Sequence, residues 1–221
     1  VIGQRAKAAI RKAVGLTGQD DSAARAVSIA VHLVNTFLLL AALSLTARWA
    51  SRGEPDKLTW RREAWLAVIA LFGTLIIGVS GAITALGDTL FPANSLAQGF
   101  VQDFSPTAHF LIRLRIYHPL VAVIVSGYIL IWLRWMRQEG RIAQKGVSTL
   151  LISLIILQLV AGAVNVVLLA PVWMQLVHLL LADLVWISLM LTSVLLISSP
   201  RLPVDRLLHQ PVEEDVKEFP S

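Results

Sequence analysis

Five long apolar runs divide the chain into segments of membrane-spanning length. They cover residues 26–47, 64–86, 108–133, 147–169 and 173–198. A spanning helix needs about 20 mainly apolar residues, whereas a spanning strand needs only about ten with alternating polarity. The pattern therefore predicts five transmembrane helices, and the expected fold class is an all-α integral membrane protein.

Composition narrows the chemistry that these helices can carry. The chain is 56% hydrophobic with a mean hydropathy of +0.71, beyond the roughly 45 to 50% of soluble proteins. It has no cysteine, which excludes disulfides, thiolate metal sites and covalent c-type haem attachment. A metal must then be held by histidine or carboxylate.

Basic residues set the expected orientation in an inner (plasma) membrane. The loops at 48–63 and 134–145 are rich in Lys and Arg, so both should be cytoplasmic. The segments "GDTLFPANSLAQGFVQDFSP" and "LLAPVWMQ" have neither residue and should face outside. The polar tail at 199–221 then lies in the cytoplasm. Because the net charge of +5 is concentrated beside helix ends, membrane lipids are the expected partner and nucleic acid is not.

The first segment conflicts with this orientation. Residues 1–25 carry several basic side chains, yet the alternation of spans places them outside, and the chain begins at Val1 rather than Met. We therefore expect a piece of a longer membrane protein. The predicted organisation is an extra-membrane or helix-end segment at 1–25, a helix left from a preceding bundle at 26–47, a four-helix bundle at 64–198 and a cytoplasmic tail.

Three histidines share one depth in the predicted membrane. His32, His118 and His178 lie on helices that run from outside to inside, roughly 8 to 15 Å below the outer surface. A shared depth suits a planar cofactor ligated from two sides. Each could instead hydrogen-bond to a neighbouring helix. Zinc and copper would want further ligands, whereas bis-histidine haem needs only two imidazoles and an apolar slot.

The stretch "SPTAHFLIRLRIYHPLVAVIV" surrounds one of these histidines with cations. Arg115 lies one turn closer to the surface than His118, and Arg113 lies further out. Either guanidinium could pair with a haem propionate, or it could reach up to lipid headgroups. His109, at the helix start, is expected at the membrane interface.

Other helices offer walls for such a slot. A small-residue strip comprises Gly73, Gly78, Gly81 and Ala85. A polar stripe in the fourth span comprises Gln158, Gly162 and Asn165. The strip permits close contact with a helix or a porphyrin face. Asp183, deeper in the last span, needs a partner or a proton.

The first and last spans share a short sequence pattern. Both "SIAVHLVNTFLLLAALSL" and "MQLVHLLLADLVWISLML" place Val-His-Leu near the outer end of a helix. If they are equivalent members of two repeats, His178 closes a bundle with His118 as its partner. His32 would then close an earlier bundle.

The chain resembles the heme A synthase family. The resemblance covers about residues 15–200 and is carried by "ARAVSIAVHLVNTFLLLAAL", "SGAITALGDTLFP", "DFSPTAHFLIRLRIYHP" and "QLVAGAVNVVLLAPVWMQLVHLLLADLVW". It implies two pseudo-symmetric four-helix bundles with a histidine pair each. By this resemblance His118 and His178 hold haem b, and His32 binds the substrate haem O, whose methyl group is oxidised to a formyl.

The chain also departs from that family. The other histidine of the first pair, the glutamate implicated in catalysis and the cysteine pair of some members have no counterpart in these residues. This chain alone could not complete the oxidation. The competing hypothesis is a non-catalytic haem-b subunit that carries electrons or braces a respiratory complex. The electron donor and any homo-oligomer stay open.

Overall fold

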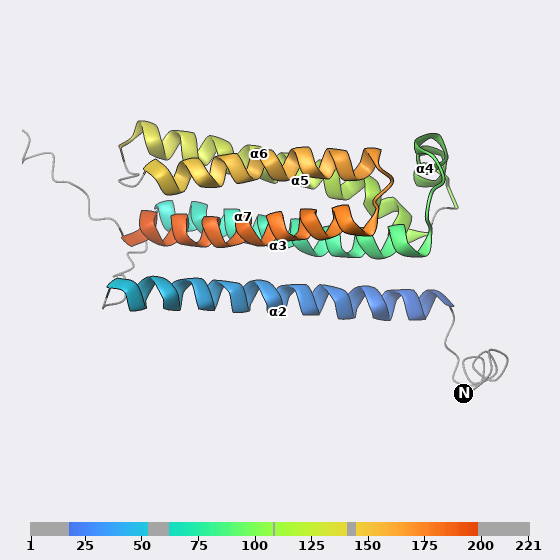
Figure 1. Cartoon of the computed structure of the whole chain (residues 1–221), viewed down its shortest axis with the longest axis horizontal. Coiled ribbons are helices and arrows are strands. Elements are labelled where there is room, and N and C mark those ends of the chain that lie inside the picture. The colour runs from blue at the N-terminus through green and yellow to red at the C-terminus, as the bar shows by residue number, and fades with distance from the viewer. Residues whose placement is uncertain (1–17, 53–61, 108, 141–144, 199–221) are drawn as a thin grey trace, which may run out of the picture.

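The structure, a computed structural model, describes residues 18–52, 62–107, 109–140 and 145–198 (Figure 1). Its elements are α2 (Gly18–Arg52), α3 (Arg62–Leu90), α4 (Leu96–Asp103), α5 (Phe110–Gln138), α6 (Lys145–Val167) and α7 (Val172–Ser198). All except α4 are long and apolar enough to cross a membrane. The predicted all-α fold with five spans is confirmed. Predictions for residues 1–17 and 199–221 lie outside the described residues.

Most helices run beyond the apolar stretch that predicted them. α2 begins at Gly18 rather than at residue 26, and α5 ends at Gln138 rather than at 133. A helix satisfies its own backbone polar groups, so it can continue from the hydrocarbon through the interface. α6 instead ends at Val167, before Leu169 and Ala170, whose φ values of 61° and 53° turn the chain into α7.

Helices α3, α5, α6 and α7 form a closed four-helix bundle. α5 packs against α3 and α6, and α7 packs against the same two helices. α5 and α7 therefore stand at diagonally opposite corners. α2 lies outside this ring, along α3 and α7 (Figure 1).

The end of the bundle next to the basic loops has a tightly packed apolar core. Its buried members are Ala67, Ala70, Ile129, Trp132, Leu133, Met136, Leu151, Ile155, Val185 and Leu189. The hydroxyl of Tyr128 adds a hydrogen bond of 2.9 Å to the carbonyl of Leu66, from α5 to α3. Because lipid is as apolar as these side chains, close packing and such hydrogen bonds hold the helices together.

α2 docks on the bundle through one aromatic contact. Phe37 stacks on Trp186 of α7 with ring centroids 4.8 Å apart, and Trp186 Nε1 donates to the Phe37 carbonyl at 2.7 Å. A Cβ on Gly78 of α3 would lie 2.9 Å from Leu33 and 3.0 Å from Phe37. The missing side chain of Gly78 therefore permits the close approach of α2.

The small-residue strip on α3 serves several neighbours. A Cβ on Gly73 would lie 2.9 Å from Val125 of α5, whereas Gly78 faces α2 and Gly81 faces His118. The close helix contact expected of this strip is confirmed at Gly73 and Gly78.

The short helix α4 was not predicted. Its N-cap Ser95 accepts a hydrogen bond from the backbone N–H of Gln98 at 3.2 Å, and Gln98 Oε1 accepts from the N–H of Asn94 at 2.9 Å. A serine followed three residues later by glutamine is a known helix-start signal. α4 lies beyond the end of the bundle (Figure 1).

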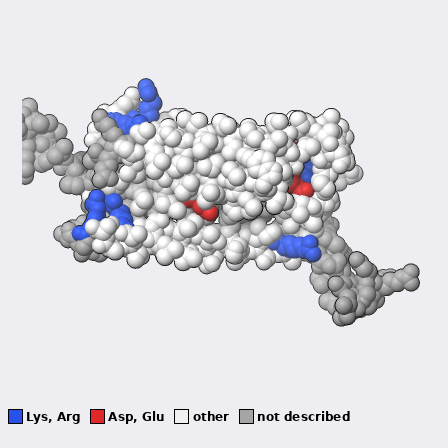
Figure 2. Space-filling model, in the orientation of Figure 1, with Lys and Arg blue, Asp and Glu red and all other residues white. Residues whose placement is uncertain are grey.

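Charged side chains gather toward the ends of the molecule. In Figure 2, Lys and Arg atoms cluster where α2 ends and α3 begins, and the long middle is almost uncharged apart from one small acidic patch. Arg48 and Arg52 end α2, Arg62 begins α3, and Arg134 and Arg137 end α5. This distribution is typical of a membrane protein. Which end is cytoplasmic stays a prediction.

Candidate functional site

His118 and His178 project from helices at opposite corners of the bundle. His118 lies on α5, about 12 Å along the axis from Phe110, and His178 lies on α7, about 9 Å from Val172. Both side chains are half-buried, and the two imidazoles are near enough to interact electrostatically. The structure therefore brings together the two histidines that the sequence predicts as a pair.

Each imidazole lies against a glycine of an intervening helix. A Cβ on Gly81 of α3 would come within 2.8 Å of His118 Cε1, and one on Gly162 of α6 within 3.1 Å of His178 Cε1. Real Cβ atoms almost never approach another atom as closely as 2.8 Å. The glycines let the rings lie directly against helix backbone.

Polar side chains on the same two intervening helices contact the rings. Ser80 Oγ of α3 lies 3.0 Å from His118 Nδ1, and Gln158 Nε2 of α6 lies 3.3 Å from His178 Nε2. The sequence indicated the polar stripe with Gln158 but not Ser80. The signal for Ser80 was its place directly before Gly81 in "VSGA", a small-residue segment that the strip already marked.

Packing at the level of the histidines is incomplete. Gly81, His118, Gly162 and His178 all retain partial exposure, whereas core residues nearer the basic loops, such as Leu133, are 0% exposed. Three buried polar atoms in this region have no hydrogen-bond partner among the described residues: Gln158 Oε1, Asn165 Oδ1 and His178 Nδ1. Imidazoles from opposite helices, a glycine against each ring and unpartnered polar atoms fit a planar group held between the helices.

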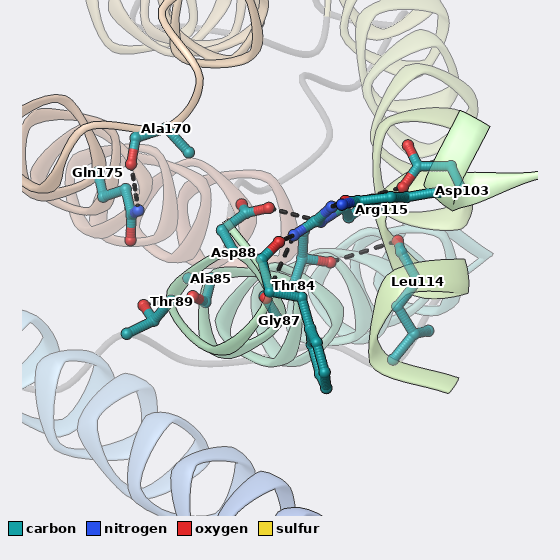
Figure 3. Close-up of polar contacts among 12 residues, drawn as sticks. Thr84, Ala85, Gly87, Asp88, Thr89, Asp103, Leu114, Arg115, Ala170 and Gln175 are labelled. Atoms are coloured by element: carbon teal, nitrogen blue, oxygen red, sulfur yellow. Dashed lines mark hydrogen bonds and ion pairs between the residues drawn. The ribbon is translucent and has the colours of Figure 1, made fainter. Parts of the chain in front are cut away.

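Arg115 is held by protein acceptors from two elements (Figure 3). Its Nε lies 2.6 Å from Asp88 Oδ1 on α3, and its Nη1 lies 3.6 Å from Asp103 Oδ1 on α4. Nη2 donates to the carbonyls of Gly87 at 3.2 Å and Phe91 at 2.6 Å. The guanidinium therefore joins α5 to the end of α3 and to α4.

The carboxylates of Asp88 and Asp103 compensate the positive charge of Arg115. The sequence analysis did not predict these partners. Asp88 and Asp103 stand at the two ends of a segment without Lys or Arg, and that complementarity was the available signal. Burial raises the pKa of Asp103, and the charge of Arg115 opposes the rise. A propionate contact of Arg115 stays a prediction, and it would have to share the guanidinium with these acceptors.

The other two cationic candidates near the start of α5 lie in the adjoining loop structure. Arg113 is exposed and donates to the carbonyl of Pro106 at 2.8 Å. His109 caps α5, with its Nδ1 accepting from the N–H of Leu111 at 3.3 Å, and its ring lies against Phe91. The structure does not place either residue beside the histidine pair.

Two further polar side chains lie within spans, and no hydrogen bond joins either of them to the histidine pair in the described parts of the chain. His32 is exposed on α2, about 140° around the helix from Phe37, which faces the bundle. His32 therefore points away from His118 and His178. Asp183 of α7 is half-buried, and its Oδ1 has no hydrogen-bond partner in the described parts of the chain.

The fold and this site define a class: a helical membrane protein whose four-helix bundle carries two histidines on diagonally opposite helices. Residues 11–190 match the COX15-CtaA family of cytochrome oxidase assembly proteins, and the chain belongs to this family.

Two curated relatives are both named protoheme IX farnesyltransferase and come from two strains of Thermus thermophilus. They are 47% and 46% identical to the chain over 180 residues. Each match covers 78% of this chain but 29% of the relative, so the chain spans less than a third of their length. No solved structure matches significantly.

Proposed function

We propose that this chain is the haem-b-binding part of a heme A synthase, with His118 and His178 as the two axial ligands. The observation that carries the proposal is their placement on diagonally opposite helices, each ring lying against a glycine, Gly81 or Gly162. A bis-histidine haem needs one imidazole on each side of its iron and flat walls along the porphyrin, and histidines on opposite helices with a glycine against each ring are compatible with both needs. The family match supports a role in cytochrome oxidase assembly.

The residues around the pair have distinct tasks in this proposal. His118 and His178 hold the iron, and Gln158 and Asn165 supply spare polar atoms beside it. Arg115, at the end of the bundle nearer to the histidines, is the propionate candidate, with Arg113 as second choice. Bound haem b would pass single electrons.

His32 is assigned to a second haem, the substrate haem O. Its outward orientation on α2 supports this, because a ligand there serves a site on the far side of the helix from the bundle. The proposed reaction converts a methyl group of haem O into a formyl by two hydroxylations and loss of water. Each hydroxylation consumes one O2 and takes two electrons and two protons from a donor, releasing one water.

The names of the relatives suggest a neighbouring activity. We assign the farnesyl transfer to the part of those proteins outside the match, since the match covers only 29% of their length. Farnesyl transfer to protohaem would supply a farnesylated haem, the substrate class proposed here. A farnesyltransferase role of this chain itself is one outcome of the test below.

The competing function is a non-catalytic haem-b subunit. The observation that favours it is that the described residues bring one pair of histidines together, His118 and His178, and a haem b needs no more than that pair. Such a subunit would bind haem b through the same pair and leave haem O unchanged.

Expression of the whole encoding gene in two bacterial hosts separates these functions. In a host that makes haem O but no haem A, the proposal predicts haem A in extracted haems, measured by chromatography and mass spectrometry, and none from a His32→Ala variant. Haem O that stays unchanged despite a bound bis-histidine haem b would favour the subunit and overturn the enzyme. In a host with protohaem only, new haem O would show farnesyl transfer, and a variant lacking the region matched here would show whether this chain is needed for it.

A further inference from the structure

The hydroxyl of Ser80 touches the candidate ligand His118 from the neighbouring helix. Its Oγ lies 3.0 Å from His118 Nδ1 and 2.9 Å from the carbonyl oxygen of Ile77, one turn earlier in α3. A serine hydroxyl has a single proton to donate, and a carbonyl oxygen only accepts. The proton of Ser80 therefore goes to Ile77, and a lone pair of Oγ faces the imidazole.

This arrangement requires a proton on Nδ1 of His118. Because the proton of Ser80 is engaged by the Ile77 carbonyl, Oγ can only accept at Nδ1, so Nδ1 must carry the N–H. A neutral imidazole carries one proton, so its other nitrogen, Nε2, keeps a free lone pair. Nε2 is then the atom that can bind a metal.

We propose that Ser80 is a positioning residue that fixes the tautomer and ring orientation of His118, and so prepares Nε2 for haem iron. This inference rests on the proposed function, because it takes His118 to be a haem ligand. Metal-ligating histidines generally donate their second N–H to such an acceptor, which raises the basicity of the ligand. The close contact of Gly81 with the ring adds a second constraint.

The surroundings of His178 can be compared directly with those of His118. α3 carries "VSGA" at 79–82, and α6 carries "VAGA" at 160–163, each with its glycine against a histidine. The position equivalent to Ser80 is Ala161, which has no hydroxyl. Consistent with that difference, His178 Nδ1 is buried without a hydrogen-bond partner among the described residues.

A contact of Gln158 with His178 is a second difference between the surroundings of the two candidate ligands. The amide Nε2 of Gln158 lies 3.3 Å from Nε2 of His178. Because an amide N–H donates, it occupies the lone pair that would bind iron. His178 must therefore exchange this contact for iron, whereas His118 is already arranged for ligation.

Reciprocal variants in the purified haem protein test this inference. Ser80→Ala removes the acceptor, Ser80→Thr restores a hydroxyl, and Ala161→Ser offers a new hydroxyl to His178. Thr74→Val is the matched control, because Thr74 lies on the same helix and donates only to the carbonyl of Ala70, at 2.8 Å. The readouts are the haem midpoint potential, the rate of haem transfer to excess apomyoglobin, and thermal unfolding of the haem-free protein.

We expect Ser80→Ala to weaken haem binding about tenfold, in the range seen for such supporting partners. The potential should rise, because a less basic imidazole stabilises ferric iron less. Ser80→Thr should recover most of both properties, and Thr74→Val should match the wild type. Ala161→Ser should shift the potential in the opposite direction, downward.

Two results would overturn the inference while leaving the haem assignment intact. One is a Ser80→Ala protein with wild-type potential and haem retention, in a background where His118→Ala abolishes the bis-histidine spectrum. The other is equal haem loss and equal thermal destabilisation in Ser80→Ala, Ser80→Thr and Thr74→Val, which would show a merely structural role. A wild-type protein without any bis-histidine haem would instead refute the proposed function.

Discussion

Asp88 and Arg115 form an ion pair of 2.6 Å, Oδ1 to Nε, that joins the last turn of α3 to α5. Their side chains are only 23% and 11% exposed. An ion pair this sheltered from water is costly to break on one side, because the remaining charge stays buried without its partner.

We therefore expect Asp88→Asn to lower the free energy of unfolding by about 2 kcal/mol, below the 3 to 5 kcal/mol of fully buried pairs because some solvent reaches this one. Thermal unfolding of the haem-free protein in detergent measures the effect. Arg113→Gln is the control, since Arg113 is exposed and contacts a loop carbonyl. Equal stability of Asp88→Asn and the control would show that the pair contributes nothing.

Arg115 also tests the propionate assignment. A carboxylate clamp needs the planar guanidinium, so Arg115→Lys should weaken haem retention and shift the potential, and Arg115→Leu should do more of both. Because the same variants disturb Asp88, Asp88→Asn serves as a second control: it frees Arg115 for a propionate and should leave haem retention at least as strong. If Arg115→Leu keeps haem with an unchanged potential, Arg113 becomes the better candidate.

The glycine walls give a steric prediction. Gly81→Ala places a Cβ within 2.8 Å of the His118 ring and should displace it, so the low-spin haem spectrum should be lost or strongly altered. Gly162→Ala, at 3.1 Å from His178, should act more weakly. Gly127→Ala on α5 meets nothing within 4 Å and should be neutral, or stabilising by up to about 1 kcal/mol. A normal spectrum in Gly81→Ala would mean that the ring does not lie against this backbone.

The docking of α2 depends on Trp186. Trp186→Phe keeps an aromatic ring against Phe37 but removes the 2.7 Å hydrogen bond, so it should cost about 1 kcal/mol in thermal unfolding. Trp173→Phe, at a residue that is 60% exposed, is the matched control and should change little. Identical behaviour of the two variants would argue against this contact as the anchor of α2.

Sequence reasoning recovered those features that depend on position along a helix. Apolar runs gave the five spans, and residue counts placed His118 and His178 at one depth. The sequence does not predict in the same way which side of each helix faces its neighbours. That α5 and α7 stand diagonally, with Gly81 and Gly162 facing the rings, depends on how all four helices pack.

The features that were missed depend on loops and on distant pairs. α4 is hard to predict because it is short and lies between two spans, although Ser95 and Gln98 form a helix-start signal. The partners of Arg115 were missed because Asp88 and Asp103 approach it only after the chain folds back. The contact of Ser80 with His118 arises in the same way.

The absence of cysteine makes the predicted orientation simple to test. A single cysteine at Asn94, between α3 and α4, should react with a membrane-impermeant maleimide on intact cells. One at Glu139, at the end of α5, should react only after the membrane is opened. The reverse pattern would invert the orientation and place the histidines near the cytoplasmic face.

The most direct test of the central claim is the reduced-minus-oxidised spectrum of the purified protein and its histidine variants. If His118 and His178 are axial ligands of one haem b, the wild type shows a low-spin bis-histidine spectrum, which His118→Ala and His178→Ala each abolish and His109→Ala leaves intact. An unchanged low-spin spectrum in His118→Ala or His178→Ala would contradict the assignment.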